Sequence, residues 1–163
     1  MNTCWVVATE VLPRNMAQSR AKQERALGET LGVIIAIISS TLDGFTRKSE
    51  LLREHCREVG TDFDAIVRSA NYNVAIGRDE AEVQERMQAA KARLLPFVGE
   101  EKAERSLGAV RGLPACGTPE QIVENLRALE KAGMSYGIFN FAEADYDRSG
   151  IELFEREVIP ALT

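Results

Sequence analysis

The spacing of apolar and polar residues along this chain changes between a helical period and a strand period. After Ser40 and Thr41, which suit a helix N-cap, apolar residues recur at helical spacing until Gly60. Gly60 supplies a typical helix stop. The pattern therefore predicts a helix between these signals, and its apolar stripe contains Phe45, Leu52, Cys56 and Val59.

The next segment, residues 66–76, alternates in the manner of a β-strand. A central parallel strand is usually apolar on both sides, but here one side is small and polar. Two interpretations stay open: a barrel strand whose inner side is partly polar near a ligand, or an edge strand with one solvent-exposed face. The apolar side contains Ala70, Tyr72, Val74 and Ile76, and the polar side contains Ser69, Asn71, Asn73 and Ala75.

Helical signals return directly after that strand. Asp79 and Glu82 have the spacing of a capping box, and Pro96 is expected to close the helix that they open. Residues 100–110 form a second, shorter helical segment. A short strand is then expected over residues 113–116.

A helix with strong end signals follows the short strand. Thr118 suits its N-cap, Pro119 its first helical position, and Gln121 the reciprocal capping position. Gly133 suits its C-terminal cap. The sequence therefore predicts a well-bounded helix between Thr118 and Gly133.

The ends of the chain complete an alternating pattern. Residues 136–141 form an aromatic and β-branched strand, and residues 151–162 a last helix. At the other end, residues 5–12 and 32–38 are possible strands around a helix at residues 15–30. Strands that alternate with helices of this length indicate a parallel sheet with crossover helices. About five such units are present, fewer than the eight of a complete barrel.

Composition and charge narrow the class of protein. The net charge of −5, with Lys and Arg alternating with Glu, argues against a nucleic-acid partner. Three cysteines without a C-x-x-C pair suit a reducing cytosol. The longest apolar run, Leu31 to Ile38, is too short for a membrane helix, and the first residues lack the features of a signal peptide. A cytoplasmic protein without membrane or nucleic-acid contacts is expected.

Several separated motifs resemble the carboxy-terminal end of luciferase-like monooxygenases. The helix start G-T-P-E lies at Gly117–Glu120, an A-G pair precedes the last strand, and LFEREVIPAL closes the chain. Upstream, the pattern R-S-x-x-x-x-V-x-x-G matches residues 68–77. The likeness covers about Ser40 to Thr163. It divides the chain into residues 1–39, a divergent amino-terminal segment, and residues 40–163, the carboxy-terminal half of a luciferase-like barrel.

The resemblance implies a fold and a chemistry. The implied fold is α/β: a partial TIM-type (β/α) barrel in which parallel strands alternate with helices. The implied cofactor is reduced FMN or the deazaflavin coenzyme F420, acting on a small organic substrate. One departure is important, because the family's glycine-rich phosphate loop has no counterpart here: Gly28 and Gly32 are isolated.

Candidate contacts follow from the rule that functional groups of a barrel lie at the carboxyl ends of its strands. Backbone N–H groups at Gly117 and Thr118 can contact an anion or a flavin edge, although a plain helix cap explains both residues. Asn140 can hydrogen-bond a cofactor ring if it points inward, and packing is the alternative. Arg111 can meet an acidic substrate, and a surface arginine is the alternative. No catalytic residue is identified.

Other polar residues are given structural interpretations. The carboxylates Glu143, Asp145 and Asp147 do not have the spacing of a calcium loop and are interpreted as a polar loop, so no metal site is predicted. His55 is interpreted as a partly buried structural residue. None of the cysteines stands in an obvious catalytic motif with it.

Two functional hypotheses result. The first is a luciferase-like oxidoreductase that uses a flavin or deazaflavin, in shortened form. The second is a non-catalytic half barrel, or an oligomerising subunit, that has lost its cofactor. An open half barrel exposes two sheet edges and an apolar inner face. A homo-oligomer, or a partner chain that covers these edges, is therefore expected.

Overall fold

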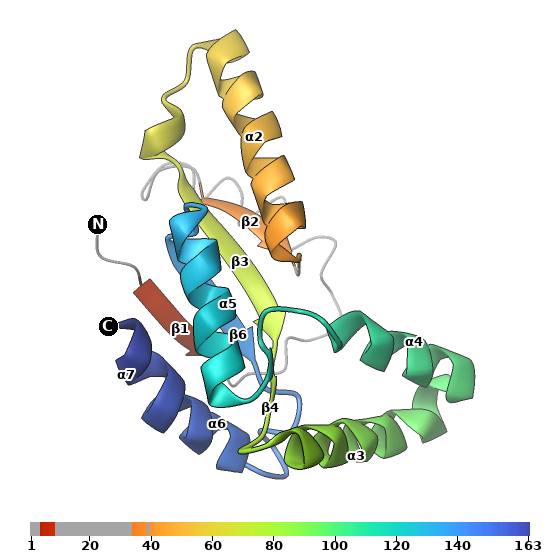
Figure 1. Ribbon diagram of the computed structural model, residues 1–163. Helices are drawn as coiled ribbons and strands as arrows, with labels where there is room; N and C mark the ends of the chain where they lie inside the picture. The colour runs from red at the N-terminus through yellow and green to blue at the C-terminus, as the bar shows by residue number, and fades with distance from the viewer. Residues whose placement is uncertain (1–3, 9–33, 39) are drawn as a thin grey trace.

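The computed structural model describes residues 4–8, 34–38 and 40–163. Four strands form one all-parallel sheet in the order β1-β6-β3-β2 (Figure 1). Within the described ranges the sheet is open, with β1 and β2 at opposite edges. The predicted α/β class with a partial barrel is confirmed. The four strands are β1 (Cys4–Ala8), β2 (Ile34–Ile38), β3 (Val67–Asn73) and β6 (Tyr136–Asn140).

The strand order places the beginning of the chain beside its end. Cys4 of β1 lies opposite Tyr136 of β6, as the first and last strands do in a closed barrel. Ile34 of β2 lies opposite Val67 of β3. The two expected amino-terminal strands are thus confirmed over Cys4–Ala8 and Ile34–Ile38, while the helix expected between them lies outside the described residues. The division of the chain at residue 39 stays a prediction.

The strand expected over residues 66–76 is interrupted at Val74, which corrects the prediction of one continuous strand. The N–H of Val74 donates to the carbonyl of Asn140 at 2.9 Å, whereas the N–H of Ala75 donates to Ala115 at 3.1 Å. The chain therefore changes partner from β6 to β5 (Cys116–Gly117), and its last two residues form β4 (Ala75–Ile76). Because β3 pairs with β2 on one side and β6 on the other, the edge-strand interpretation is wrong.

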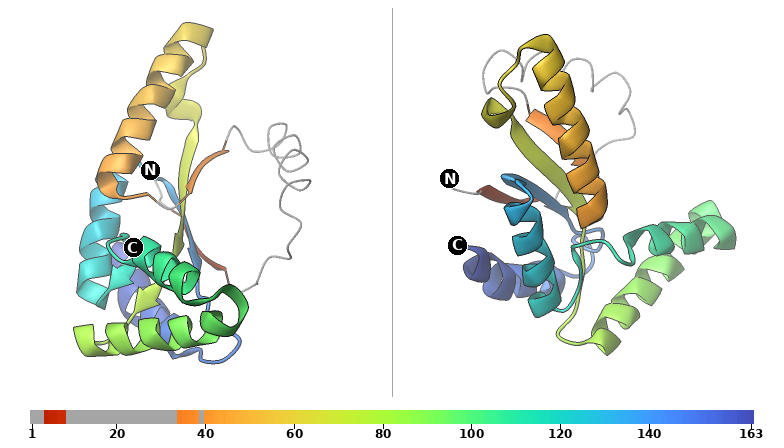
Figure 2. Two further views of the ribbon diagram at one scale, coloured as in Figure 1. Left: turned by 90° about the vertical axis from the view of Figure 1, so that its right-hand side faces the viewer. Right: turned by 45° about the horizontal axis from the view of Figure 1, so that its top comes forward.

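Helices cover one face of the sheet. α2 (Leu42–Val59) and α5 (Pro119–Lys131) lie along this face, as the edge-on view in Figure 2 shows. The expected last helix is one helical segment with a π-helical turn in its middle: α6 (Ser149–Leu153), η2 (Phe154–Val158) and α7 (Ile159–Leu162). The core between sheet and helices includes Phe45, Ala70, Tyr72, Ile122, Leu126, Leu129, Phe139, Phe141, Phe154 and Val158.

Local end signals fix the boundaries of α2. The side chain of Thr41 accepts a hydrogen bond from the N–H of Gly44 at 3.2 Å, and Gly60 takes the left-handed conformation at φ 74°. Its apolar stripe is shorter than expected, because Val59 is 74% exposed. The last turn of α2 leads to the 3₁₀ turn η1 (Phe63–Ala65), and Phe63 is buried there against Cys56.

Two helices, α3 (Glu80–Val98) and α4 (Glu100–Val110), project from the carboxyl edge of the sheet (Figure 1). Pro96 does not close α3 as expected: it lies inside the last turn, and the helix ends at Gly99, where φ is 78°. The helix ends at Gly99 because glycine adopts a positive φ without strain. In the part of the chain that the structure describes, no helix has the length and apolarity to cross a bilayer.

Candidate functional site

The carboxyl ends of the strands meet at one edge, from which α3 and α4 also leave. Asn73 lies opposite Asn140 in the β3–β6 ladder. Three residues further along the chain, Ile76 lies opposite Gly117 in the β4–β5 ladder. Two of the predicted cofactor contacts, Gly117 and Asn140, thus lie at the edge where parallel sheets and barrels carry their ligands.

Asn140 lies on the face of the sheet opposite the helices. Phe139 and Phe141, its neighbours in sequence, are buried in the core under the helices, so the Asn140 side chain points the other way. Its Nδ2 donates a hydrogen bond to Oδ1 of Asn71, which stands on the same face of β3. The polar side predicted for residues 66–76 therefore faces away from the helices, as the inner face of a barrel sheet does. Along β3 and β6 this face carries Val67, Ser69, Asn71, Asn73, Tyr136, Ile138 and Asn140, which is more polar than the apolar inner face expected.

A pocket of about 200 Å³ lies between this edge and the α3–α4 pair. Its wall is mostly apolar, with four polar residues that come from separate segments: Asn73, Arg86, Ser106 and Glu143. An apolar wall with few polar groups is typical of small-molecule sites, although such sites usually measure about 300–1,000 Å³. The pocket therefore suits a small organic molecule rather than a whole flavin. The apolar lining comprises Val74, Ala75, Met87, Ala90, Leu94, Leu107, Val110 and Ala142.

Glu143 is the titratable group of the pocket that sequence reasoning assigned to an ordinary polar loop. It follows β6 by three residues, and burial raises the pKa of its carboxyl, against the opposing influence of Arg86 and Arg93. A side chain at Gly150 would come within 2.8 Å of the Glu143 carboxylate, so the glycine leaves room for it. Glu143 can therefore exchange a proton nearer neutral pH than an exposed glutamate does.

Arg86 is held beside Glu143 by groups from two elements. Its Nη2 donates to Glu82 at 2.8 Å and to the Ser149 hydroxyl at 2.7 Å, while Nη1 lies 3.4 Å from Asp147. Hydrogen bonds from Arg78 and Arg86 lower the pKa of Glu82 to about 2. The predicted capping box is formed only in part. The Asp79 side chain accepts from the N–H of Glu82, but the Glu82 carboxylate accepts from the N–H of Arg78 and not from that of Asp79. Arg86 is thus rigidly placed at the pocket.

Gly117 and Thr118 have their polar groups engaged within the fold. The N–H of Thr118 donates to the Gln121 side chain at 2.9 Å, and its hydroxyl donates to Glu120 at 2.8 Å. A methyl group at Gly117 would lie 2.3 Å from the same Gln121 oxygen, so glycine makes the cap possible. These contacts favour the helix-cap interpretation of both residues over ligand binding.

Arg111 is exposed at the C-terminal end of α4. Its Nη2 lies 3.5 Å from the Gln84 side chain of α3, and it is not among the residues that line the pocket. The structure thus separates Arg111 from Asn140 and Glu143. His55 is also exposed, on α2, which corrects the expectation of a partly buried residue. Of the two cysteines with described side chains, Cys56 is buried and Cys116 is half-buried.

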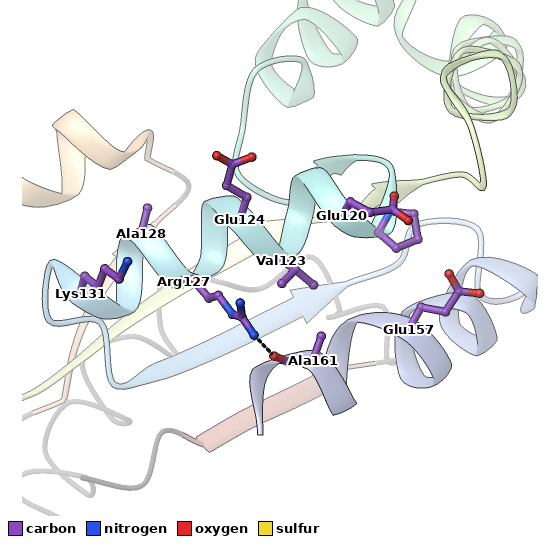
Figure 3. Close-up of a pocket in the computed structure, with 9 residues that line it drawn as sticks. Glu120, Val123, Glu124, Arg127, Ala128, Lys131, Glu157 and Ala161 are labelled. Atoms are coloured by element: carbon purple, nitrogen blue, oxygen red, sulfur yellow. Dashed lines mark hydrogen bonds between the residues drawn. The ribbon is translucent and has the colours of Figure 1, made fainter.

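A second, larger hollow of about 650 Å³ lies on the outer surface, between α5 and α7. Figure 3 shows Arg127 reaching from α5 across this hollow to the carbonyl of Ala161, a hydrogen bond of 2.7 Å. The helices separate this hollow from the polar face of the sheet and from the carboxyl edge. It is therefore a groove between two packed helices and does not form part of the candidate site.

Sequence comparisons give no assignment, because no protein-family model and no curated protein matches the chain. Solved structures do match its fold. The F420-dependent tetrahydromethanopterin reductase of Methanopyrus kandleri is 18% identical over 99% of this chain and 51% of its own, with a TM-score of 0.57. An F420-dependent secondary alcohol dehydrogenase is 14% identical over 98% of this chain and 48% of its own, with a TM-score of 0.57.

A third neighbour is a monooxygenase. The EDTA monooxygenase of Chelativorans sp. BNC1 is 19% identical over 83% of this chain and 40% of its own, with a TM-score of 0.58. This chain spans between 40% and 51% of the length of these three structures. The neighbours are luciferase-like enzymes, so the resemblance seen in the sequence motifs is matched by the fold. The described residues have, in partial and open form, the α/β barrel fold of these luciferase-like enzymes.

Proposed function

We propose that this chain is an oxidoreductase that uses a flavin or a deazaflavin, and that its described residues supply one part of the cofactor site. The observation that carries the proposal is the Asn71–Asn140 pair on the polar face of the sheet, next to the pocket at the carboxyl edge. Carboxamides offer both donors and acceptors, which a flavin ring edge requires. The fold shared with the two F420-dependent enzymes supports the same class of cofactor.

In this proposal the cofactor supplies the redox chemistry, and the protein supplies position and proton transfer. Asn140, fixed by Asn71, orients the ring at the carboxyl edge. The apolar wall around Met87 and Leu107 holds a small organic substrate and excludes water. Glu143, whose pKa burial raises, holds a proton at its carboxyl beside that substrate.

Two groups of the described residues that could meet the phosphate of FMN at the carboxyl edge are already engaged within the fold. The two terminal nitrogens of Arg86, the basic residue of the pocket, are already bound to Glu82, Asp147 and Ser149, and the Thr118 N–H is bound to Gln121. We therefore expect riboflavin and FMN to bind with similar affinity. The same occupied groups favour the alternative function, a half barrel that no longer holds a cofactor.

Titration with FMN, riboflavin and a deazaflavin, followed by fluorescence quenching and visible absorption, tests the proposal. The variant Asn140→Ala should weaken ring binding about three- to ten-fold, the loss expected for one hydrogen bond. Asn125→Ala is the matched control, because Asn125 lies on α5 and donates to the carbonyl of Pro114 away from the polar face. If the wild-type chain binds none of the three ligands, the cofactor-free alternative is correct.

A further inference from the structure

The two edge strands of the sheet have one paired side each in the described part of the chain. β1 pairs with β6 and β2 pairs with β3, and all of these ladders are parallel. The outward N–H and C=O groups of an edge strand form a template for another strand. Both edges have the same length, since Cys4–Ala8 and Ile34–Ile38 contain five residues each.

The number and direction of the strands fit closure by a second copy. Eight parallel strands make a barrel whose interior side chains just fill. The described residues of one copy supply a continuous ladder of four parallel strands, so those of two copies supply eight. We propose that two copies of this chain close one ring, in which β1 of each copy pairs in parallel with β2 of the other around a two-fold axis along the strands.

Pairing between identical edges would not have the same result. A two-fold axis perpendicular to the strands would set β1 against β1 in antiparallel orientation and leave both β2 edges unpaired. Pairing of β1 with β2 gives hydrogen-bond partners to the edge strands of both copies. No edge is then left for a third chain. The two edges of one copy are thus complementary to each other.

The ring would also complete the candidate site. The face that carries Asn71 and Asn140 would turn inward, and the carboxyl ends of both copies would open on the same rim because every strand runs in one direction. Glu143 from each copy would stand at that common mouth. Formation of the ring does not require a bound cofactor, so a chain that fails to bind flavin can still form it.

The first measurement is the mass of the purified full chain by size exclusion with light scattering, where a dimer is expected. Proline substitutions then remove edge donors. Consecutive residues of a strand direct their N–H groups to opposite sides, so Val6→Pro and Val7→Pro differ in whether they remove an outward or an inward donor. The same holds for Ile35→Pro and Ala36→Pro in β2.

In each pair, one variant removes an N–H that points out from the sheet edge. This outward variant should fold and become a monomer. Circular dichroism and thermal unfolding identify which variant of each pair keeps the fold. Glu100→Pro is the control, because Glu100 occupies the first position of α4, where proline is tolerated, and lies away from both edges. This control should remain a dimer.

Mixing the two outward variants gives the decisive result. Each interface of the ring uses β1 from one chain and β2 from the other, so a mixture of a β1 variant and a β2 variant keeps one intact interface. A heterodimer should therefore form from two monomeric variants. A monomeric wild-type chain, a dimer that survives either edge substitution, or a folded mixture that stays monomeric would each overturn the proposal.

Discussion

The side-chain amide of Asn140 donates a hydrogen bond to the side-chain oxygen of Asn71, which joins β6 to β3 on the face of the sheet opposite the helices. This bond fixes which way the Asn140 carboxamide is turned, because only its nitrogen can donate. The bond joins two neutral side chains, so it carries no cost of burying a charge.

The Asn71–Asn140 bond should contribute measurably to stability. Asn71→Ala and Asn140→Ala should each lower the free energy of unfolding, and the double variant should lose less than the sum. The expected coupling is about 1 kcal/mol, the net value of a neutral hydrogen bond. Urea unfolding of the four chains measures it. Strictly additive losses would show that the two amides do not interact in solution.

Sequence signals predicted both ends of α2 and the start of α5 because these signals are local. Thr41 and Gly60 determine the boundaries of α2 through contacts within a few residues, and Thr118 begins α5 for the same reason. The break at Val74 could not be predicted in this way. It arises because the hydrogen-bond partner changes from Asn140 to Ala115, residues that lie far away in the sequence.

The candidate site shows the same division between local and distant information. Asn140 was recognised because its position at the end of a strand is visible in the sequence pattern. The common pocket of Arg86 and Glu143 could not be predicted, because α3 and the segment after β6 meet only in the folded chain. One available signal was the position of Glu143 three residues beyond a predicted strand, at the end where ligands bind.

A side chain at Gly133 should destabilise the fold. The φ of this glycine is 97°, and a methyl group there would lie 2.3 Å from Nη1 of Arg68. Gly133→Ala should therefore destabilise the fold by roughly 2–3 kcal/mol, from backbone strain together with the clash. Thermal unfolding measures this loss.

A matched control for this prediction is Gly108→Ala, because Gly108 lies in α4 and a methyl group there meets open space. That change should stabilise the chain by about 0.5–1 kcal/mol. Adding Arg68→Ala to Gly133→Ala should recover the part of the loss that comes from the clash. No recovery would assign the whole effect to the backbone conformation.

Glu82 should make the chain sensitive to acid. Hydrogen bonds from Arg78 and Arg86 lower the pKa of its carboxyl to about 2, below the unfolded value. A lowered pKa gives stability that is present above the unfolded pKa and is lost as the pH falls towards 2. Compared with Glu82→Gln, the wild-type chain should be more stable by about 0.5–1 kcal/mol near neutral pH, because partly exposed ion pairs contribute little. The difference should vanish near pH 2, and a difference independent of pH would contradict the assignment.

Glu143 should show the opposite dependence on pH. Burial raises the pKa of its carboxyl; Arg86 and Arg93 oppose this shift, and Asp147 adds to it. A raised pKa gives stability that is fully present below the unfolded pKa and is lost as the pH rises through the folded pKa. Glu143→Gln cannot lose a proton, so this variant should match the wild-type chain in acid and become the more stable of the two at alkaline pH. Urea unfolding across the pH range measures the difference, and carbon NMR of the Glu143 carboxyl follows the titration directly. If the variant is instead less stable at alkaline pH, the charged carboxylate is stabilised by its arginine neighbours and Glu143 does not hold a proton at the pocket.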